Sequence, residues 1–343
     1  MDKLLTLQQK IVPEIFPLLL SRYQVLRAIR FSQPIGRRAL AERLHFQERK
    51  IRNEVDLLKS QELIICSAMG MEVTPEGDVL LWALEDYIRE IQGLSLLEQK
   101  IAELFKVKKV MVVPGDTDQD DSVKKNLARV TAEYLLHHLT NGSILAVTGG
   151  TTLAEVAGAL TVPAAKRDIT VIPARGGLGE EVEIQANAVA ANIAKGLGAS
   201  YRLLHAPDDL QAKTMQSIVD EPKIREILDL LRRADMVLHG IGSAEEMARR
   251  RETPSGKITE LLGQGAVGEA FGYYFALDGS VIYSTSSIGL QLNELSLIDQ
   301  VVAVAGGKSK AKAVIAVLSN APRDVLIIDE GAARAVVAMT SSG

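Results

Sequence analysis

A regular alternation of short apolar runs with longer amphipathic stretches, from about residue 106 to the C-terminus, constrains the fold most strongly. The apolar runs resemble buried strands, and the stretches between most of them have helical spacing. Strands separated by helices form a parallel sheet with helices on its faces. Residues 106–343 are therefore predicted to form one α/β domain, with a hairpin inserted over 270–284. Its expected strands are 109–113, 143–147, 169–174, 200–204, 236–240, 301–305 and 325–329.

Two similar Gly-Gly segments follow expected strands of this sheet. One is AVTGGTTLAEVAGAL at 146–160, and the other is AVAGGKSKAKAVIAVL at 303–318. Each continues into an amphipathic helix, and the free N–H groups and dipole of a helix start favour an anion. Both segments lie at the carboxyl edge of the sheet, where ligands of such sheets bind. They predict two phosphate cradles, the first with Gly149, Gly150, Thr151 and Thr152, and the second with Lys310.

Further residues near the same edge would complete an anion site. Arg175 follows the strand at 169–174, and Gln185 lies near the start of the next helix. Glu269 lies among glycines and would suit sugar hydroxyls. Arg250 and Arg251 belong to a basic stretch at 247–256, predicted as a loop that could close over an anion. For each arginine, a solvated surface charge is the alternative interpretation.

The N-terminal part of the chain concentrates positive charge. Residues 21–60 contain ten Arg or Lys against four Asp or Glu, a net charge of +6, whereas the remainder carries −10. Such an uneven distribution indicates a nucleic-acid footprint at one end of the chain.

The same part has the pattern of a winged helix-turn-helix. Apolar spacing predicts helices at 21–31, 37–44 and 47–63, and residues 63–77 are expected to form a hairpin that ends in a turn at 74–77. In such domains the last helix enters the major groove. A small helical bundle with a basic solvated face is the alternative. The residues expected to contact DNA are Arg37, Arg38, Gln47, Arg49, Lys50, Arg52 and Asn53.

Between these parts, residues 78–105 carry apolar side chains at steps of three and four. This seam is typical of a helical linker that pairs with a second copy, but it also fits a helix packed on the chain's own C-terminal domain. Domains that read the DNA groove recognise a longer DNA site when they dimerise, because each copy binds one half-site. This favours self-association as a dimer or tetramer. The predicted division is thus 1–77 for DNA binding, 78–105 for the linker and oligomerisation, and 106–343 for ligand binding.

Several function classes are disfavoured. The single cysteine, Cys66, forms no intramolecular disulfide and agrees with a reducing cytoplasm, and we expect no metal site, cofactor or membrane span. Gly307-Lys308-Ser309 resembles part of a nucleotide-binding P-loop, but position 302 is Val where that motif needs Gly. Asp329 is instead expected to cap the following helix. The stretch 239–243 offers no carboxylate pair for general acid–base catalysis.

Taken together, these motifs resemble those of the SorC/DeoR-type sugar-binding transcriptional regulators over essentially all 343 residues. The resemblance is carried by the helix-turn-helix, by TGGTTLAEVA at 148–157, by VIPARGGLG at 171–179 and by the second Gly-Gly segment. It implies a Rossmann-like effector domain similar to ribose-5-phosphate isomerase and glucosamine-6-phosphate deaminase. The isomerases carry Asp-Gly-Ala-Asp-Glu where this chain has His239 to Ser243, so the catalytic carboxylates are missing.

The resemblance further implies a repressor of a glycolytic triose-phosphate operon, controlled by fructose 1,6-bisphosphate. Phosphate contacts would come from Gly149, Gly150, Thr151, Thr152, Arg175, Arg250, Arg251 and Lys310, and sugar contacts from Gln185 and Glu269. The partners would be operator DNA, the sugar phosphate and further copies of the chain. The alternative is an active sugar-phosphate isomerase or deaminase with an appended DNA-binding module.

Overall fold

The computed structural model describes residues 7–8, 10–160, 168–177, 181–206, 212–320 and 323–341. The chain packs as two compact units, Met1–Leu96 with Asp120–Val123, and Leu97–Gln119 with Lys124–Gly343. Leu178 and Gly179, at the end of one family-like motif, lie outside the described residues.

The N-terminal unit is a winged helix-turn-helix. It comprises α2 (Ile15–Ser32), α3 (Arg37–Leu44), α4 (Glu48–Ser60) and the antiparallel wing of β1 (Ile64–Ser67) and β2 (Gly70–Val73), followed by α5 (Pro75–Ala83) and α6 (Glu85–Ile91). The apolar stripe Ile51, Val55 and Leu58 of α4 is buried, as the spacing predicts. The predicted turn at 74–77 is wrong: Thr74 caps α5 by accepting a hydrogen bond from the Gly77 N–H at 3.0 Å, and Pro75 begins that helix.

The predicted linker is divided among shorter helices that pack inside the chain. The seam is interrupted after α5 and again at Gly93, whose φ of +68° lies in the left-handed region, before α7 (Leu94–Phe105). Leu81 and Ile88 are fully buried in the apolar cluster of the winged helix. Leu94 and Ile101 are fully buried as well. The boundaries predicted at 77 and 105 therefore differ from those of the packing units. Part of the seam is buried within the chain, whereas Leu104 is 49% exposed, and pairing with a second copy stays a prediction.

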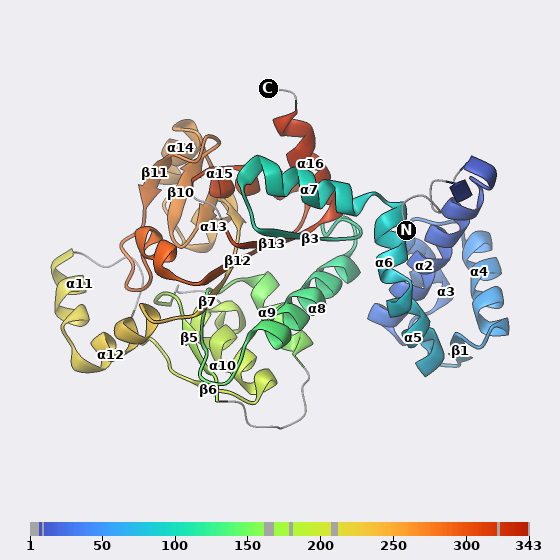
Figure 1. Ribbon diagram of the computed structural model, residues 1–343, viewed down its shortest axis with the longest axis horizontal. Helices are drawn as coiled ribbons and strands as arrows, with labels where there is room; N and C mark the ends of the chain where they lie inside the picture. Colours follow the sequence, from blue (N-terminus) through green and yellow to red (C-terminus); the bar gives the residue numbers. More distant parts are fainter. Residues whose placement is uncertain are drawn as a thin grey trace. The chain divides into compact units, whose positions relative to one another are not determined.

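The C-terminal unit contains the predicted parallel sheet (Figure 1). Within the described residues, its strands run in the order β3-β13-β12-β7-β4-β5-β6, and every neighbouring pair is parallel. The direction in which successive strands are added reverses between β4 and β7: β5 and β6 lie on one side of β4, whereas β12 and β13 lie on the far side of β7. The strands are β3 (Lys109–Val113), β4 (Ile144–Val147), β5 (Thr170–Pro173), β6 (Ser200–Tyr201), β7 (Met236–Gly240), β12 (Gln300–Ala305) and β13 (Val325–Asp329).

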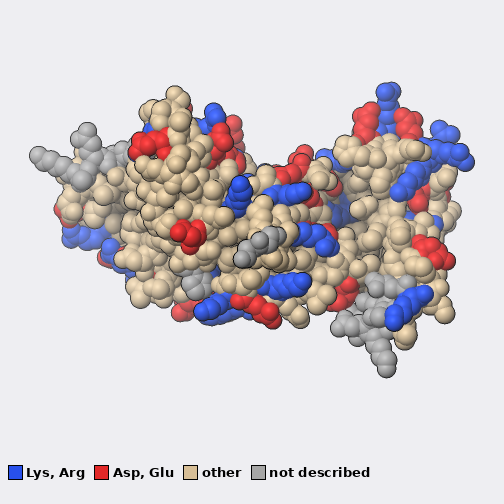
Figure 2. Space-filling model, turned by 90° about the horizontal axis from the view of Figure 1, so that it is seen from above, with Lys and Arg blue, Asp and Glu red and all other residues tan. Residues whose placement is uncertain are grey.

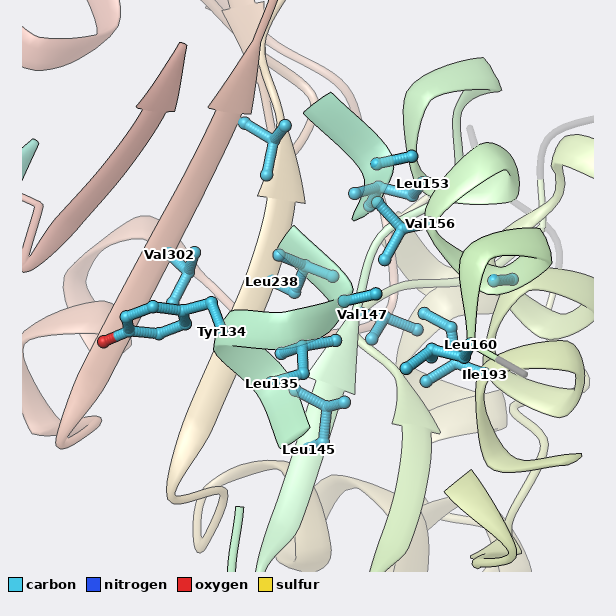
Figure 3. Packing of buried hydrophobic residues seen from close by; sticks show 14 of the residues in the cluster. Tyr134, Leu135, Leu145, Val147, Leu153, Val156, Leu160, Ile193, Leu238 and Val302 are labelled. Carbon is cyan, nitrogen blue, oxygen red and sulfur yellow. The ribbon is translucent and has the colours of Figure 1, made fainter. Parts of the chain in front are cut away.

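An apolar core joins one part of this sheet to α8 (Asp121–His138), α9 (Thr151–Ala159) and α10 (Ala186–Leu197). Leu135, Val156 and Ile193 from these helices meet Val147 and Leu238 from the central strands (Figure 3). Burial of such side chains contributes about 1.5–3 kcal/mol each to folding. The remaining helices include α11 (Ala212–Val219), α12 (Pro222–Leu231), α15 (Ala311–Asn320) and α16 (Glu330–Thr340).

A second, antiparallel sheet has the order β11-β10-β9-β8. Its strands are β8 (Gly242–Ser243), β9 (Ala266–Ala270), β10 (Tyr273–Ala276) and β11 (Val281–Ser284), so the predicted hairpin at 270–284 is part of a larger sheet. Between β8 and β9 lie α13 (Ala244–Arg250) and α14 (Ser255–Gly263). The prediction of a basic loop at 247–256 is therefore wrong over much of its length. Arg250 ends a helix that Ser243 caps by accepting from the Glu246 N–H at 3.4 Å.

Candidate functional site

One pocket lies at the carboxyl ends of β4, β5 and β7, where chain order reverses between β4 and β7. Doubly wound sheets bind ligands at such a switch point, because the loops from the two adjoining strands lead in opposite directions. The pocket has about 810 Å³ of empty space, part of it open to solvent. All ten predicted ligand residues line it: Gly149, Gly150, Thr151, Thr152, Arg175, Gln185, Arg250, Arg251, Glu269 and Lys310.

The first Gly-Gly loop and the start of α9 form part of the lining of this pocket. Gly149 packs so closely on the following loop that a Cβ there would lie 2.5 Å from the carbonyl oxygen of Ile184. Gly150 has φ +122°, a conformation that favours glycine, and a Cβ at this position would have no neighbouring atom within 4 Å. Among the described residues, the backbone N–H groups of Thr151, Thr152 and Leu153 donate to no protein acceptor, while that of Ala154 begins the helical bonding. The start of α9 thus offers free donors and two hydroxyls to a ligand.

The second Gly-Gly loop is not a free cradle, which corrects the expectation of two such sites. The Gly307 N–H donates to Asp329 Oδ2 at 2.7 Å, and the Ser309 N–H donates to Asp118 Oδ2 at 2.7 Å. The Lys308 N–H donates to Asp116 Oδ1 at 3.2 Å. The protein's own carboxylates therefore take the donors that a phosphate would need. Only Lys310 of the predicted second site lines the pocket.

Asp329 has the capping role predicted for it. Its Oδ1 accepts from the Ala332 N–H at 2.9 Å, and Oδ2 also accepts from the Thr117 N–H at 2.8 Å. The carboxylate is fully buried. Burial raises its pKa, and the backbone donors oppose that rise. This side chain therefore caps α16 and joins the loops that follow β3 and β12 to the start of that helix.

Glu269 is the centre of a buried ion-pair group. Its Oε1 accepts from Arg251 Nη2 at 2.8 Å and lies 3.7 Å from Arg175 Nη1. The side chains of Glu269, Arg175 and Arg251 are only 6%, 7% and 7% exposed. Arg251 also donates to the Tyr274 hydroxyl at 3.0 Å. Glu269, expected to contact sugar hydroxyls, therefore first serves as the counter-ion that holds two arginines against the pocket.

The same contacts change the interpretation of Arg251. Burial opposes the charge of its guanidinium, but Glu269 and Tyr274 outweigh this effect and raise the pKa of Arg251 above its usual value. It is permanently charged and fixed in position. Of the two arginines expected to close over an anion, only Arg250 has its side chain at the partly exposed rim, where it is 25% exposed.

Glu246 is a pocket residue that the sequence reasoning missed. Its Oε1 lies 3.0 Å from Arg250 Nη2, and its Oε2 lies 3.9 Å from Lys310 Nζ. It precedes Arg250 by one helical turn and lies just before the basic stretch at 247–256, so the i, i+4 spacing of Glu246 and Arg250 was the available sequence signal. The two cations at the rim are thus bridged by a carboxylate. Gln185 occupies the predicted helix start, as the residue that precedes α10.

His239 lies at the end of β7, where the isomerases carry carboxylates. It is fully buried, packs on Phe271 with ring centroids 4.6 Å apart, and its Nδ1 lies 3.1 Å from the Gly240 carbonyl oxygen. Burial, reinforced by the charge of Arg323, lowers the pKa of His239 to about 3. The imidazole is neutral near pH 7 and cannot replace the missing acid–base pair.

The candidate DNA-binding face lies on the N-terminal unit. Arg37, Arg38, Gln47, Arg49, Lys50, Arg52 and Asn53 are all exposed. Arg37 pairs with Asp56 at 3.2 Å, and Arg38 pairs with Glu42, whereas Arg49 and Arg52 have no acidic partner within the described residues. Figure 2 shows several Lys and Arg side chains of this unit, at the right, projecting into solvent. Other basic residues are engaged within the unit: the partly exposed Arg22 pairs with the buried Glu54, and Arg27 is buried.

The parts of the chain that the structure describes contain no cluster of three or more His, Cys, Asp or Glu that could hold a metal ion. None of their helices is both long and apolar enough to cross a membrane.

Comparison with known proteins matches both units to described families. Residues 18–88 match the CggR N-terminal DNA-binding domain, and residues 89–338 match a sugar-binding domain. The Central glycolytic genes regulator of Priestia megaterium is 45% identical over 98% of this chain and 99% of its own length. The chain belongs to the SorC family of sugar-binding transcriptional regulators.

Further relatives of this family agree. The Central glycolytic genes regulator of Bacillus subtilis is 41% identical over 97% of this chain and 98% of its own length. A SorC family regulator from Enterococcus faecalis of known structure is 40% identical, with a TM-score of 0.66 over 71% of this chain and 99% of its own. The full-length sorbitol operon regulator SorC from Klebsiella pneumoniae has a TM-score of 0.65 over 88% of this chain and 93% of its own at 16% identity, which shows the fold alone.

Membership of the SorC family answers the question of catalysis. The two matched families are a DNA-binding domain and a sugar-binding domain, and the two relatives that cover nearly the whole chain are named regulators. The chain is therefore a transcriptional regulator and not an enzyme, and the alternative of an active isomerase or deaminase is set aside.

Proposed function

We propose that this SorC family regulator represses a glycolytic triose-phosphate operon and that fructose 1,6-bisphosphate controls its binding to the operator. The glycolytic assignment is supported by the two regulators that share 45% and 41% identity with nearly the whole chain. The protein would act in the cytoplasm as a dimer or tetramer, with operator DNA and the sugar phosphate as its partners. It would need no cofactor.

One observation supports a phosphorylated ligand most strongly. The pocket brings free N–H donors at the start of α9 together with Arg250 and Lys310, in a site also lined by Arg175 and Arg251. Helix-start donors and nearby cations are the groups that bind phosphate in proteins. Glu246 and Glu269 offset only two of these four positive charges. The pocket is thus suited to an anion, and Gln185 and Glu269 would contact the sugar that carries it.

A bisphosphate fits because the donors are divided. One phosphate would bind at Gly149, Gly150, Thr151 and Thr152, and the other would bind the basic set formed by Arg175, Arg250 and Lys310. With the second Gly-Gly loop filled by carboxylates, side-chain cations rather than a second helix start would hold the second phosphate.

Thermal unfolding with a panel of ligands tests this proposal, because a ligand that binds only the native state raises the melting temperature. At a concentration one hundred times its Kd, a ligand stabilises the fold by about 2.7 kcal/mol. Fructose 1,6-bisphosphate is expected to raise the melting temperature at lower concentration than fructose 6-phosphate, and fructose is expected to leave it unchanged. Equal effects of the bisphosphate and the monophosphate would exclude the divided-phosphate arrangement.

A further inference from the structure

Glu246 places a negative charge where the proposed second phosphate would bind. Its two carboxylate oxygens face the two rim cations, at 3.0 Å from Arg250 Nη2 and 3.9 Å from Lys310 Nζ. All three residues line the pocket. A phosphate that binds both cations must therefore displace this carboxylate or share the cations with it.

The surroundings of Glu246 allow it to be displaced. Its side chain is 40% exposed, and the side chains of Arg250 and Lys310 are 25% and 23% exposed. A carboxylate at such a rim can turn into water without leaving a charge buried. Exposed ion pairs of this kind are weak, with a median contribution of about 0–1 kcal/mol, so a better anion can replace one partner.

The other carboxylate of the pocket behaves differently. Glu269 has a side chain only 6% exposed and holds Arg175 and Arg251, and its Oε1 accepts from the Gly272 N–H. Removing it would leave two buried guanidinium groups without their counter-ion, which is strongly unfavourable. Of the two acids that line the described pocket, Glu246 is therefore the exchangeable one and Glu269 the fixed one.

We propose that Glu246 is an internal anion that bridges Arg250 and Lys310 until a ligand phosphate displaces it. This competition determines how much negative charge a ligand needs in order to bind, and at which ligand concentration the pocket fills. The proposal rests on the proposed function, because it takes a phosphorylated ligand as the competitor. A phosphate dianion attracts the two cations more strongly than a carboxylate does. A neutral sugar has no group that can replace Glu246.

The test is isothermal titration calorimetry on the full chain, with fructose 1,6-bisphosphate and, separately, inorganic phosphate as probes. The variant Glu246→Gln keeps the size of the side chain and removes its charge. The matched control is Glu245→Gln on the same helix, because Glu245 pairs with Arg249, 2.7 Å away, and does not line the pocket. Thermal unfolding without ligand verifies that both variants fold.

Glu246→Gln is expected to bind both probes about three- to tenfold more tightly than wild type at low salt, since a like charge a few ångströms from the phosphate is removed. The gain should shrink as ionic strength rises, because salt screens that repulsion. Glu245→Gln should bind like wild type. A salt-dependent gain distinguishes competition from a packing effect.

Binding by Glu246→Gln that is equal to or weaker than wild type, or a failure of both proteins to bind either probe, would overturn the proposal. The first result would show that Glu246 holds the rim cations in place for the ligand. If Glu246→Gln gains affinity for inorganic phosphate while the bisphosphate does not bind, the internal anion stands and the proposed effector is wrong.

Discussion

At the scale of single residues, the local environment decides what each charged side chain does. Glu246 and Glu269 both line the pocket, but one is partly exposed at its rim and the other is buried between two arginines. The sequence shows only that both are acidic. Arg250 and Arg251 are neighbours in the chain, yet the side chain of Arg250 is partly exposed to solvent, whereas that of Arg251 is held by Tyr274 and Glu269. Burial of this kind depends on the tertiary fold and has no local sequence signal.

His239 gives a residue-scale prediction for stability. Its pKa of about 3 in the folded protein lies below the unfolded value of 6.5, so between these pH values the unfolded chain binds the extra proton. This contribution to stability is complete above pH 6.5 and is lost as pH falls towards 3, by up to about 1.4 kcal/mol per pH unit.

His239→Phe keeps a ring against Phe271 and removes the titrating group. The free energy of unfolding of wild type, relative to that of the variant, is expected to fall by about 2 kcal/mol between pH 7 and pH 5. Urea unfolding followed by circular dichroism at the two pH values measures this difference, and the subtraction removes the contribution of all carboxylates common to both proteins. A difference that does not change with pH would mean that the imidazole is not buried in neutral form.

At the scale of elements, periodicity predicted most of the fold because it records which faces are buried. The strands of the parallel sheet, the helices α3 and α4 and the wing all lie close to their expected positions. The failures concern contacts between distant segments. The Gly-Gly segments at 146–160 and 303–318 look alike, but Asp116 and Asp118 lie more than 180 residues before the second loop and occupy its donors. Long-range contacts also affect the seam at 78–105, because Leu81 and Ile88 pack in the apolar cluster of the winged helix, and its pairing with a second copy stays a prediction.

The helix α4 gives the prediction at this scale. Arg49 and Asn53 are exposed on the same side of α4, opposite the buried Ile51, Val55 and Leu58. Arg49→Ala and Asn53→Ala are each expected to weaken operator binding by about 1–3 kcal/mol and to relax specificity at the base pair concerned. Lys59→Ala, at the exposed C-terminal end of the same helix, is the control and should have much less effect.

Fluorescence polarisation with a labelled promoter fragment of the triose-phosphate operon measures these affinities. Wild-type binding by both Arg49→Ala and Asn53→Ala would show that α4 does not read the DNA. A loss that is equal on specific and unrelated DNA would instead assign the residue concerned to phosphate contacts.

At the scale of the whole molecule, two groups of positive charge are proposed to serve two ligands, one group for DNA and the other for the sugar phosphate. The N-terminal residues 21–60 carry a net charge of +6 and include Arg49 and Arg52 of α4, which have no acidic partner in the described part of the chain. In the C-terminal unit, Arg175, Arg250, Arg251 and Lys310 line the pocket. The family resemblance, rather than any spacing, named the sugar, and the pocket geometry supports only the class of ligand. A ligand can shift the protein between states only by binding one of them more tightly.

Operator binding measured by fluorescence anisotropy, while fructose 1,6-bisphosphate is titrated against wild type and Arg250→Ala, tests the central claim most directly. The bisphosphate is expected to change the operator affinity of wild type. Arg250→Ala should bind operator normally without ligand, because it leaves the N-terminal unit unchanged, but it should need a much higher bisphosphate concentration to respond. If Arg250→Ala responds at the same bisphosphate concentration as wild type, or if wild type does not respond at all, the pocket does not control DNA binding in the way proposed.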